Sequence, residues 1–502
     1  AFYDEGGADN LTLGTDHPFR YTLRALIVPL SVLSVTLAPV MATGQALPRD
    51  AGDYVIVGGR LWVGTGDEAI ANPGILIRNG TILQVGSFGE QYTDLPRIEL
   101  TDEHFLMPGL FDLHAHYAVD LFGEGRVDEY TVNPVLFLAN GVTSTFPAGE
   151  VDPAEARKGR ERIASGEISG PRIYSSGPYW GTARPGWQHE AMTPDSIRIE
   201  GASWALNGAH GFKAKGIRPD QLEAVIEVAH AHGLTVTAHL DSGFRNSVNP
   251  RDAILMGIDR IEHFLGGDAL PATQSAYESL EALDLDHTLT ATKIREQSKL
   301  FIEHGAFFDA TLTAYGYFAD REAAVYEYWE DEMGFLTPYA RAIVDAGLPK
   351  TPSEQFGRIY RVKRETVKAF YDEGGADNLT LGTDHPSWGE FFSGFGSHRE
   401  LHAMVLAGIP NPAALRAGTI NAARAIGVDT RLGTIESGKY ADLIVIEGDP
   451  LREITDTRNV RIVVKAGRVY DTKELLDGVR GAMGPLSSTD ADWWKGNLRL
   501  GR

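Results

Sequence analysis

The sequence predicts an α/β protein: a (β/α)8 barrel of the TIM type with a small β-sandwich domain built from both flanks of the barrel. Three observations support this fold class. Strand-like runs alternate with helical patterns through the middle of the chain, and strand-rich segments stand on both sides of that middle. In addition, 43% of the 502 residues are apolar, which is enough to bury a large core.

Short strand patterns with Gly and Asn at the turns begin at Tyr54, as YVIVGG, RLWVG, GILIRNG and TILQVGS. Matching patterns return near the end, as ADLIVIEGD and VRIVVKAGRVYD. Two strand-rich arms of one chain can pair in one sheet domain. We therefore expect a small β domain made of residues 47–107 and 427–475, a barrel over 108–426 inserted between them, and an irregular tail over 476–502.

The middle of the chain contains eight strand-like runs, the number that a (β/α)8 barrel needs. In chain order they are GLFDLHAH, GVTSTFPAG, RIYSSGPY, GFKAKG, TVTAHL, RIEHF, FFDATL and LTLGTD. Helical patterns follow several of them, such as RPDQLEAVIEVAHAHG after GFKAKG. The segment between Tyr315 and Lys368 is too long for one connection, so we expect inserted helices there, over the carboxyl ends of the strands, as a lid or substrate wall.

Residues 1–18 repeat residues 369–386 letter for letter. Structural repeats diverge in sequence and recur several times, because each unit needs neighbours to bury its face. We therefore interpret the first copy as an artefact and exclude Asp16 and His17 from the site.

A secretory signal peptide is predicted over residues 19–46. Arg20 and Arg24 form a basic start, an uncharged stretch follows over 25–42, and small residues stand before the expected cleavage point. A membrane anchor is the alternative reading, but the stretch is short for a span and contains two prolines. We expect a periplasmic or secreted protein with no stable membrane span after signal removal.

Charge and cysteine content exclude several classes of protein. The chain has 46 Lys and Arg against 68 Asp and Glu, a formal charge of −22, so its field repels nucleic acid and anionic lipid. It has no cysteine, and therefore no disulfide, thiolate ligand or cysteine nucleophile. Any metal must be held by His, carboxylate or a less usual ligand.

Two His-x-His pairs differ in what they can bind. His114 and His116 lie two positions apart on a predicted strand, so both imidazoles point to one side. His230 and His232 have the same spacing in a helical pattern, where such side chains diverge and cannot share a metal. The first pair is therefore a ligand candidate and the second is not.

Other strand ends add Lys213 in GFKAKG, His239 in TVTAHL, His263 in RIEHF and Asp384 in LGTDHP. The spacings of 26 residues from Lys213 to His239 and 24 residues from there to His263 each equal one strand-plus-helix unit. We therefore expect these three residues on neighbouring strands at matching heights. Because burying so much polarity without compensation is costly, their convergence at the carboxyl ends of barrel strands predicts a metal site.

At these residues the sequence resembles a known family. MPGLFDLHAHY, Lys213, AHL, EHF and GTD, together with LGTIESGKYADLIVIEGDPL, are similar to the metal-dependent amidohydrolase superfamily. Within it they resemble the imidazolonepropionase-related branch that includes prolidase-like and N-acyl-amino-acid-hydrolysing enzymes. The resemblance covers residues 53–475 approximately.

The resemblance implies two divalent metal ions, Zn²⁺ with Mn²⁺, Co²⁺ or Fe²⁺ as alternatives. The implied protein ligands are His114, His116 and Asp384 for one ion and His239 and His263 for the other, with a CO₂-derived carbamate on Lys213 touching both. Such ions would supply hydroxide near neutral pH. Asp384 would take the proton from the attacking water and pass it to the leaving nitrogen, so Asp384 and Lys213 are the implied catalytic residues.

Lys215 and the HRELH segment are competing candidates for the metal site. Lys215 also points inward but lies one layer nearer the loop, which favours Lys213. In HRELH, His398 and His402 stand four apart on a predicted helix, as a metal pair can. The order with Glu400 is not His-Glu-x-x-His, however, so a packed or solvated helix face is favoured.

Aromatic residues after the third and seventh strands predict substrate walls. The candidate substrate-binding residues are Tyr179, Trp180, Arg184, Trp187, His189 and Tyr315. Arg184 is the expected partner of a substrate carboxylate, and Tyr315 the expected donor to a carbonyl or tetrahedral oxyanion.

These observations predict an exported binuclear metal-dependent amidohydrolase that cleaves an amide bond of a dipeptide or N-acyl amino acid, with a bulky apolar group and a free carboxylate. Hydrolysis of a cyclic amide, lactone or ester on the same scaffold is the alternative, and a non-catalytic binding or scaffold protein is a further one. The expected partner is a small-molecule amide or peptide substrate, and we expect a homo-oligomer.

Overall fold

The computed structural model describes residues 52–88, 91–121, 127–347, 352–386, 391–490 and 492–494. All of them belong to one compact unit, Leu47–Arg502. The duplicate segment 1–18 and the signal peptide expected over 19–46 lie outside the described residues. Within the described part of the chain, no helix is long and apolar enough to cross a membrane.

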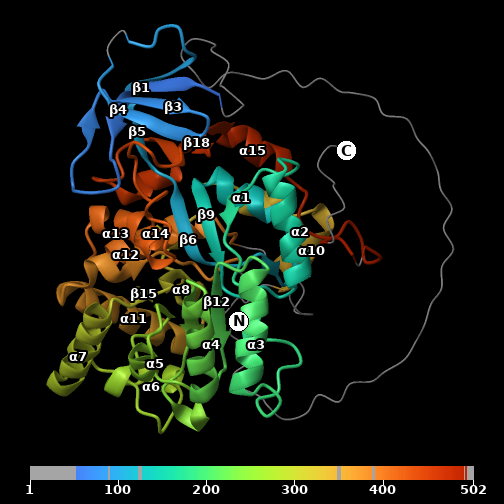
Figure 1. Cartoon of the computed structure of the whole chain (residues 1–502), viewed down its shortest axis with the longest axis vertical. Helices are drawn as coiled ribbons and strands as arrows, with labels where there is room; N and C mark the ends of the chain where they lie inside the picture. Colours follow the sequence, from blue (N-terminus) through green and yellow to red (C-terminus); the bar gives the residue numbers. More distant parts are fainter. Residues whose placement is uncertain are drawn as a thin grey trace. The chain divides into compact units, whose positions relative to one another are not determined.

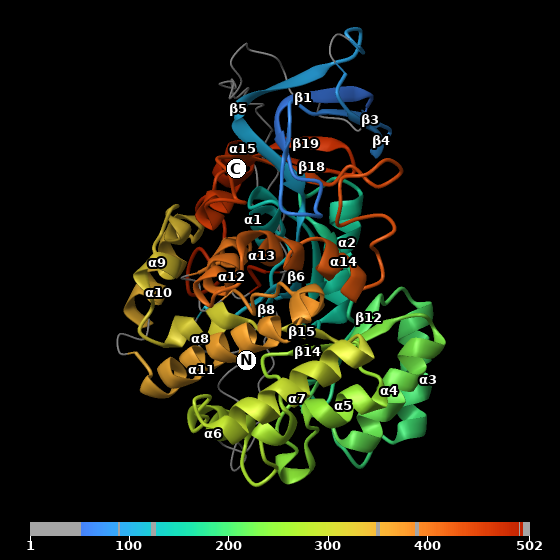
Figure 2. The same cartoon turned by 90° about the vertical axis from the view of Figure 1, so that its left-hand side faces the viewer.

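The two strand-rich arms form one sheet, as the sequence predicts. Its strand order is β19-β18-β17-β5-β1-β3-β4, with β2 on β1. The long strand β5 runs parallel to β1 and antiparallel to β17, which joins the arms. In both Figure 1 and Figure 2, the blue strands of the first arm lie beside the red strands of the second. The strands are β1 (Tyr54–Leu61), β2 (Ile70–Ala71), β3 (Gly74–Arg78), β4 (Thr81–Gly86), β5 (Arg97–Pro108), β17 (Leu443–Glu447), β18 (Val460–Lys465) and β19 (Arg468–Asp471).

The eight predicted barrel strands are all present, although the third is split into two short pieces, β10 and β11. They form two parallel sheets with the orders β10-β9-β6 and β11-β12-β13-β14-β15-β16. A short antiparallel pair, β7 with β8, follows the first strand. The strands are β6 (Leu110–Ala115), β7 (Ala118–Val119), β8 (Val127–Asp128), β9 (Val142–Pro147), β10 (Arg172–Ile173), β11 (Tyr179–Trp180), β12 (Gly211–Lys215), β13 (Thr235–His239), β14 (Arg260–Glu262), β15 (Phe307–Asp309) and β16 (Leu379–Thr380).

Backbone hydrogen bonds close the barrel at both seams. At one seam Leu113 N donates to Leu381 O (2.9 Å) and Asp384 N donates to His114 O (3.0 Å). At the other, Glu150 N donates to Gly177 O (3.1 Å), which connects the end of β9 to the start of β11. The first and last strands are therefore neighbours, and the residues that follow them meet.

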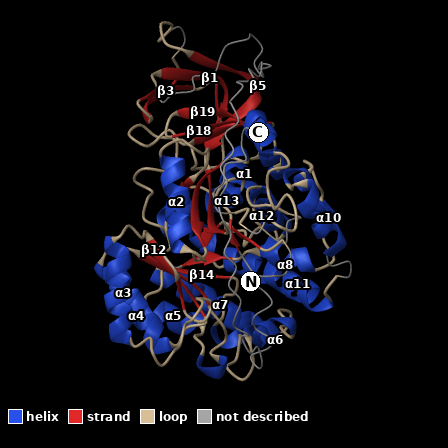
Figure 3. Cartoon of the chain, turned by 90° about the vertical axis from the view of Figure 1, so that its right-hand side faces the viewer, coloured by secondary structure: helices blue, strands red, loops and turns tan. Residues whose placement is uncertain are grey.

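Helices surround the barrel strands, as Figure 3 shows in blue around red. Helices α2 to α5 each begin with proline in the first turn, where its missing N–H is not needed. The helices are α1 (Asn133–Ala139), α2 (Pro153–Ala164), α3 (Pro194–Leu206), α4 (Pro219–Ala231), α5 (Pro250–Met256), α6 (Ala276–Glu281), α7 (Thr288–His304), α8 (Leu312–Phe318), α9 (Ala323–Tyr326), α10 (Pro338–Gly347), α11 (Glu354–Asp372), α12 (Phe395–Leu406), α13 (Asn411–Ala417), α14 (Ile420–Ala425) and α15 (Thr472–Val479).

The long segment after the seventh strand is helical, as expected, and contains α8 to α11. The expected irregular tail over 476–502 is partly wrong. Helix α15 extends to Val479, and Thr337 N donates to Met483 O (2.8 Å), so the start of this tail is ordered against the inserted segment. The sequence pattern did not indicate a helix here, but α15 directly follows the last strand, and its last residue, Val479, is buried.

Candidate metal centre

The six residues expected to form a metal site are all buried. Five of them lie near or beyond the carboxyl ends of barrel strands, and Lys213 lies in the middle of β12. Their exposed fractions range from 1% for Lys213 and His263 to 6% for His239 and Asp384. Such burial of histidine, lysine and carboxylate groups together requires compensating partners.

Asp384 joins the two histidines of the first strand. Its Oδ1 lies 2.7 Å from His116 Nε2 and 3.3 Å from His114 Nε2. The i, i+2 spacing on β6 therefore places both rings on one side, and the seam between the first and last strands brings the carboxylate to them.

His263 and His239 lie next to this group. Their ring centroids are 4.1 Å apart, and the His263 ring is 4.9 Å from that of His114. One ligand atom each from His114, His263 and Asp384 fall within 4.8 Å of one another, close enough to hold one ion. His263 Nδ1 is 2.6 Å from Thr311 Oγ1, which leaves Nε2 as the ring atom directed elsewhere.

Backbone strain is concentrated at the same strand ends. His263, Thr311 and Asp384 have φ values of +69°, +46° and +57°. Left-handed conformations of residues other than glycine cost about 1–3 kcal/mol each and persist where the surrounding structure holds them. Two of these three residues are expected ligands, so the strained backbone belongs to residues whose side chains must be oriented toward the site.

The register of the strands corrects one expectation. His239 pairs with Lys215, not with Lys213, so the matching heights expected for Lys213 and His239 are wrong. Lys213 lies deeper, and its Nζ contacts Glu262 on the next strand but one. Strands tilt in a closed barrel, so side chains from alternate strands meet at staggered positions. The half-buried Lys215 remains nearer the loop, as the sequence predicts.

Burial sets the protonation of the site. It lowers the pKa of His114, His239 and His263 well below the ordinary range, which keeps these imidazoles neutral. Burial also lowers the pKa of Lys213 well below its ordinary value. Burial by itself would raise the pKa of Asp384, but the neighbouring His114 and His116 lower it well below its usual range. The site therefore offers neutral nitrogens and an ionised carboxylate.

These donors fit a divalent cation. Neutral imidazole and carboxylate are ligands that Zn²⁺ and related ions accept. His263 Nε2 and Asp384 Oδ2 are buried and have no hydrogen-bond partner among the described residues. Cations bound at the site would satisfy both atoms.

The predicted substrate wall after the third strand is only partly in place. Tyr179 pairs with Lys213 and so shares its face of the sheet, whereas Trp180 pairs with Ala214 on the opposite face. The Trp180 ring packs 5.3 Å from that of Phe212, so its expected place in the wall is wrong.

The charged and polar residues of that loop are engaged elsewhere. Arg184 forms an ion pair of 2.7 Å with Glu200 on α3, which opposes its expected role as a carboxylate partner. Trp187 Nε1 donates to His189 Nδ1 (3.2 Å), and that ring contacts Gln221 on α4 (2.8 Å). These contacts join the loop to the outer helices.

Tyr315 lies where the sequence places it, beside the metal centre. It is buried in α8, and its ring centroid is 5.9 Å from that of His263. The HRELH residues do not form a metal pair. His398 packs 5.9 Å from Trp329, while His402 Nδ1 lies 3.4 Å from the Arg458 guanidinium.

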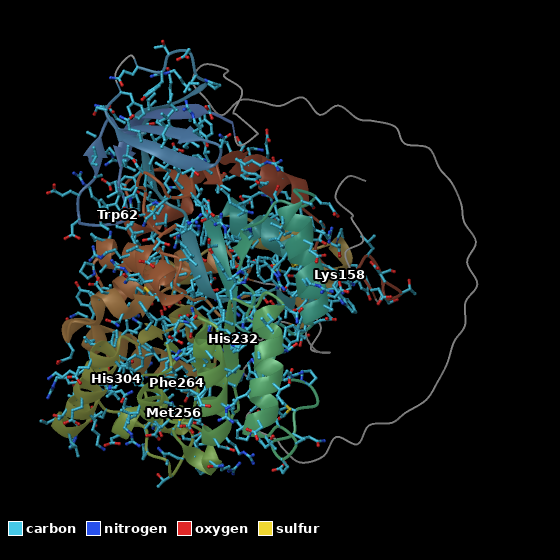
Figure 4. All side chains as sticks on the ribbon, viewed as in Figure 1. Trp62, Lys158, His232, Met256, Phe264 and His304 are labelled. Atoms are coloured by element: carbon cyan, nitrogen blue, oxygen red, sulfur yellow. The ribbon has the colours of Figure 1, made fainter. Side chains whose placement is uncertain are left out.

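The second His-x-His pair also has structural partners, as expected. His230 Nε2 contacts Asp259 Oδ2 (3.0 Å), and His232, labelled in Figure 4, contacts the Val228 carbonyl (2.8 Å).

Sequence reasoning missed four residues around the centre. Glu262 touches both Lys213 and His114, the latter at 3.3 Å from Oε2 to Nδ1. Thr311 contacts His263, Lys363 donates to the His263 carbonyl (2.7 Å), and Glu400 accepts from Leu312 N and Thr313 N (2.8 Å each) at the start of α8. Glu262 directly precedes His263 in RIEHF and could have been predicted from that position. The other three residues belong to segments far from His263 in the sequence.

Fold and site together define a barrel enzyme whose active site lies at the carboxyl ends of the strands. The amidohydrolase family model matches residues 105–470. The chain belongs to the amidohydrolase family, and it is a hydrolase acting on C–N bonds.

Solved structures share this fold. One is a Xaa-Pro dipeptidase with bound methionine in the active site, at 21% identity and TM-score 0.61, covering 84% of this chain and 100% of that one. Another is a putative prolidase from Bifidobacterium longum, at 22% identity and TM-score 0.62, covering 86% and 99%. A third is molinate hydrolase, at 20% identity and TM-score 0.61, covering 87% and 98%. No curated protein sequence matches the chain.

Proposed function

We propose that this protein is an exported, binuclear metal-dependent amidohydrolase that cleaves the amide bond of a dipeptide or N-acyl amino acid. The observation that carries the proposal is that four buried histidines and one buried aspartate gather near the carboxyl ends of barrel strands, with the buried Lys213 in the middle of β12. His114, His116 and Asp384 would hold one ion, and His239 and His263 the other.

Lys213 is suited to carry a carbamate that joins the two ions. Only the neutral amine adds CO₂, and burial favours that form. In this addition Nζ forms a bond to the carbon of CO₂ and loses a proton, and Glu262, in contact with Nζ, is placed to accept it. The resulting anion would stand among other carboxylates, so cations at the site are needed to stabilise it.

Divalent ions bound here would supply an activated water and polarise the substrate carbonyl. Asp384 then has two tasks. Its Oδ1, which lies 2.7 Å and 3.3 Å from the Nε2 atoms of His116 and His114, would share their ion. Its Oδ2, which has no hydrogen-bond partner among the described residues, would take a proton from the attacking water and deliver it to the leaving nitrogen. Tyr315 lies beside His263 and would donate to the substrate carbonyl.

The proposed substrate class takes its support from solved structures of the same fold, which include a Xaa-Pro dipeptidase and molinate hydrolase. A cyclic amide, lactone or ester remains the alternative substrate. We test the choice by loading the purified protein with Zn²⁺ or Mn²⁺ and measuring kcat/KM on dipeptides and N-acyl amino acids, each beside its carboxamide.

We expect the free carboxylates to be preferred by about 1–3 kcal/mol, the scale of one charged hydrogen bond. Equal rates on free and blocked substrates would contradict the carboxylate preference. Faster turnover of lactones or cyclic imides would assign the alternative, and no hydrolysis by metal-loaded protein would favour a binding role.

Export is tested on the amino-terminal segment. If residues 1–46 serve only for secretion, a chain beginning at Leu47 should fold and turn over substrate at the full-length rate, because the compact unit starts there. Loss of activity in that folded, shortened chain would contradict the assignment. We also propose a homo-oligomer, which analytical ultracentrifugation of the shortened chain would reveal as a mass above that of one chain.

A further inference from the structure

Lys363 connects an inserted helix to the metal centre. It lies on α11, is 1% exposed, and its Nζ donates to the main-chain carbonyl of His263 at 2.7 Å. Within the described part of the chain no carboxylate lies within ion-pair distance of its Nζ, although the charges of Glu400, Asp309 and Asp384 act on it. A buried amine without an ion pair is costly, so its placement calls for a reason.

Aromatic rings surround the amine on the side of the site. Nζ lies 3.7 Å from the ring centroid of Tyr315 and 5.2 Å from that of Phe264, which is labelled in Figure 4. Both rings pack against His263, at 5.9 and 5.7 Å. The carbonyl and the two rings that Nζ contacts therefore belong to His263 or pack against its ring.

His263 needs such support because its backbone is strained. Its φ of +69° is left-handed, a conformation that a residue with a side chain keeps only when the surroundings hold it. Its N–H donates to the Asp309 carbonyl (2.8 Å), its ring Nδ1 contacts Thr311, and its carbonyl accepts from Lys363. These three contacts fix the residue and leave Nε2 directed at the site.

We propose that Lys363 is a positioning residue for His263 and Tyr315: it holds the left-handed turn at His263 from its carbonyl side and fixes the ring of Tyr315 from its face. The inference rests on the proposed function insofar as His263 is taken to bind a metal. Lys363 acts through these two residues and does not touch the substrate. Its loss should therefore weaken one of the two metal sites while sparing the other.

The test compares three variants with the full chain. Lys363→Met keeps the aliphatic stem and removes the donor. Lys368→Met makes the same change on the exposed side of the same helix, where Lys368 pairs with Asp372. Thr311→Val removes the hydrogen bond between Thr311 Oγ1 and His263 Nδ1. For each protein we measure Zn²⁺ equivalents and affinity by titration, the Co²⁺ absorption spectrum, and the free energy of unfolding without metal.

We expect Lys363→Met to bind one ion as in the wild type and the second about 10–100-fold more weakly, the usual cost of losing a residue that orients a ligand. Thr311→Val should weaken the same ion, and Lys368→Met should change neither. Wild-type affinity for both ions in Lys363→Met would overturn the proposal, as would equal weakening of both ions.

If Lys363→Met does not fold, Lys363→Gln replaces it, because it keeps a polar group of shorter reach. Selective loss of one ion in that variant supports the proposal, and retention of both overturns it. Absence of metal binding in the wild-type protein would instead refute the proposed function, so the two failures are distinct.

Discussion

Gly382 stands at the seam of the barrel, two residues before Asp384, and has no room for a side chain. A Cβ there would lie 2.5 Å from the Cβ of His114 and would meet the Asp309 carboxylate. Real Cβ atoms essentially never approach so closely. Gly382→Ala therefore forces β6 away from the last strand at the point where Asp384 meets His114 and His116.

The loss of stability expected in Gly382→Ala depends on whether the atoms crowded by the new methyl group can shift. Adding a methyl to a packed interior costs about 1–3 kcal/mol. The nearest atom is an oxygen of the Asp309 side chain, which a rotamer change could move, but the Cβ of His114, at 2.5 Å, is fixed to the backbone of β6 and no rotamer change can remove it. We therefore expect the upper end of that range, about 3 kcal/mol. The 3.3 Å contact between His114 Nε2 and Asp384 Oδ1 should lengthen, and metal affinity should fall with it.

Urea unfolding and metal titration of Gly382→Ala measure both effects. Gly478→Ala is the matched control, because Gly478 lies in α15 with open space around its Cβ. That change should stabilise slightly, by about 0.5–1 kcal/mol, since alanine is the better helix former. Wild-type stability and metal affinity in Gly382→Ala would refute the tight seam on which the site depends.

Two further predictions concern buried groups outside the centre. Burial, with Arg458 and Arg399 nearby, lowers the pKa of His398 to about 3, so below pH 6.5 the unfolded chain takes up a proton that the folded chain does not. The free energy of unfolding of the wild type should therefore fall relative to that of His398→Leu by about 1.4 kcal/mol per pH unit between pH 6.5 and 3. Parallel curves of stability against pH for the two proteins would contradict this. Arg399 and Glu332 form an ion pair with both side chains 0% exposed, so Arg399→Met should lower the free energy of unfolding in urea by about 3–5 kcal/mol. The double variant Arg399→Met with Glu332→Leu should recover most of this loss. An equal loss in the double and the single variant would argue against the pair.

Much of the fold could be predicted because it rests on local patterns. Apolar runs bounded by Gly, Asn and helical patterns located the barrel strands, and the i, i+2 rule placed His114 and His116 on one side. The ends of parallel strands share one edge, which was enough to gather His239, His263 and Asp384 as well.

The remaining site residues depend on contacts between distant segments. Trp180 follows Tyr179 directly, and only the pairing of β11 with β12 decides which of the two faces inward. Arg184 finds Glu200 on a separate helix. Lys363 reads as one basic residue of an amphipathic helix, and nothing near it in sequence indicates a contact with His263, 100 residues away.

The proposed binuclear centre depends on Lys213, and one comparison tests it most directly: the metal content and hydrolysis rate of the wild type, Lys213→Ala and Lys215→Ala, purified in parallel. We predict two equivalents in the wild type, loss of at least one equivalent and most activity in Lys213→Ala, partial recovery of both with added short carboxylic acids, and a milder change in Lys215→Ala. Full metal content and normal rate in Lys213→Ala would contradict the account.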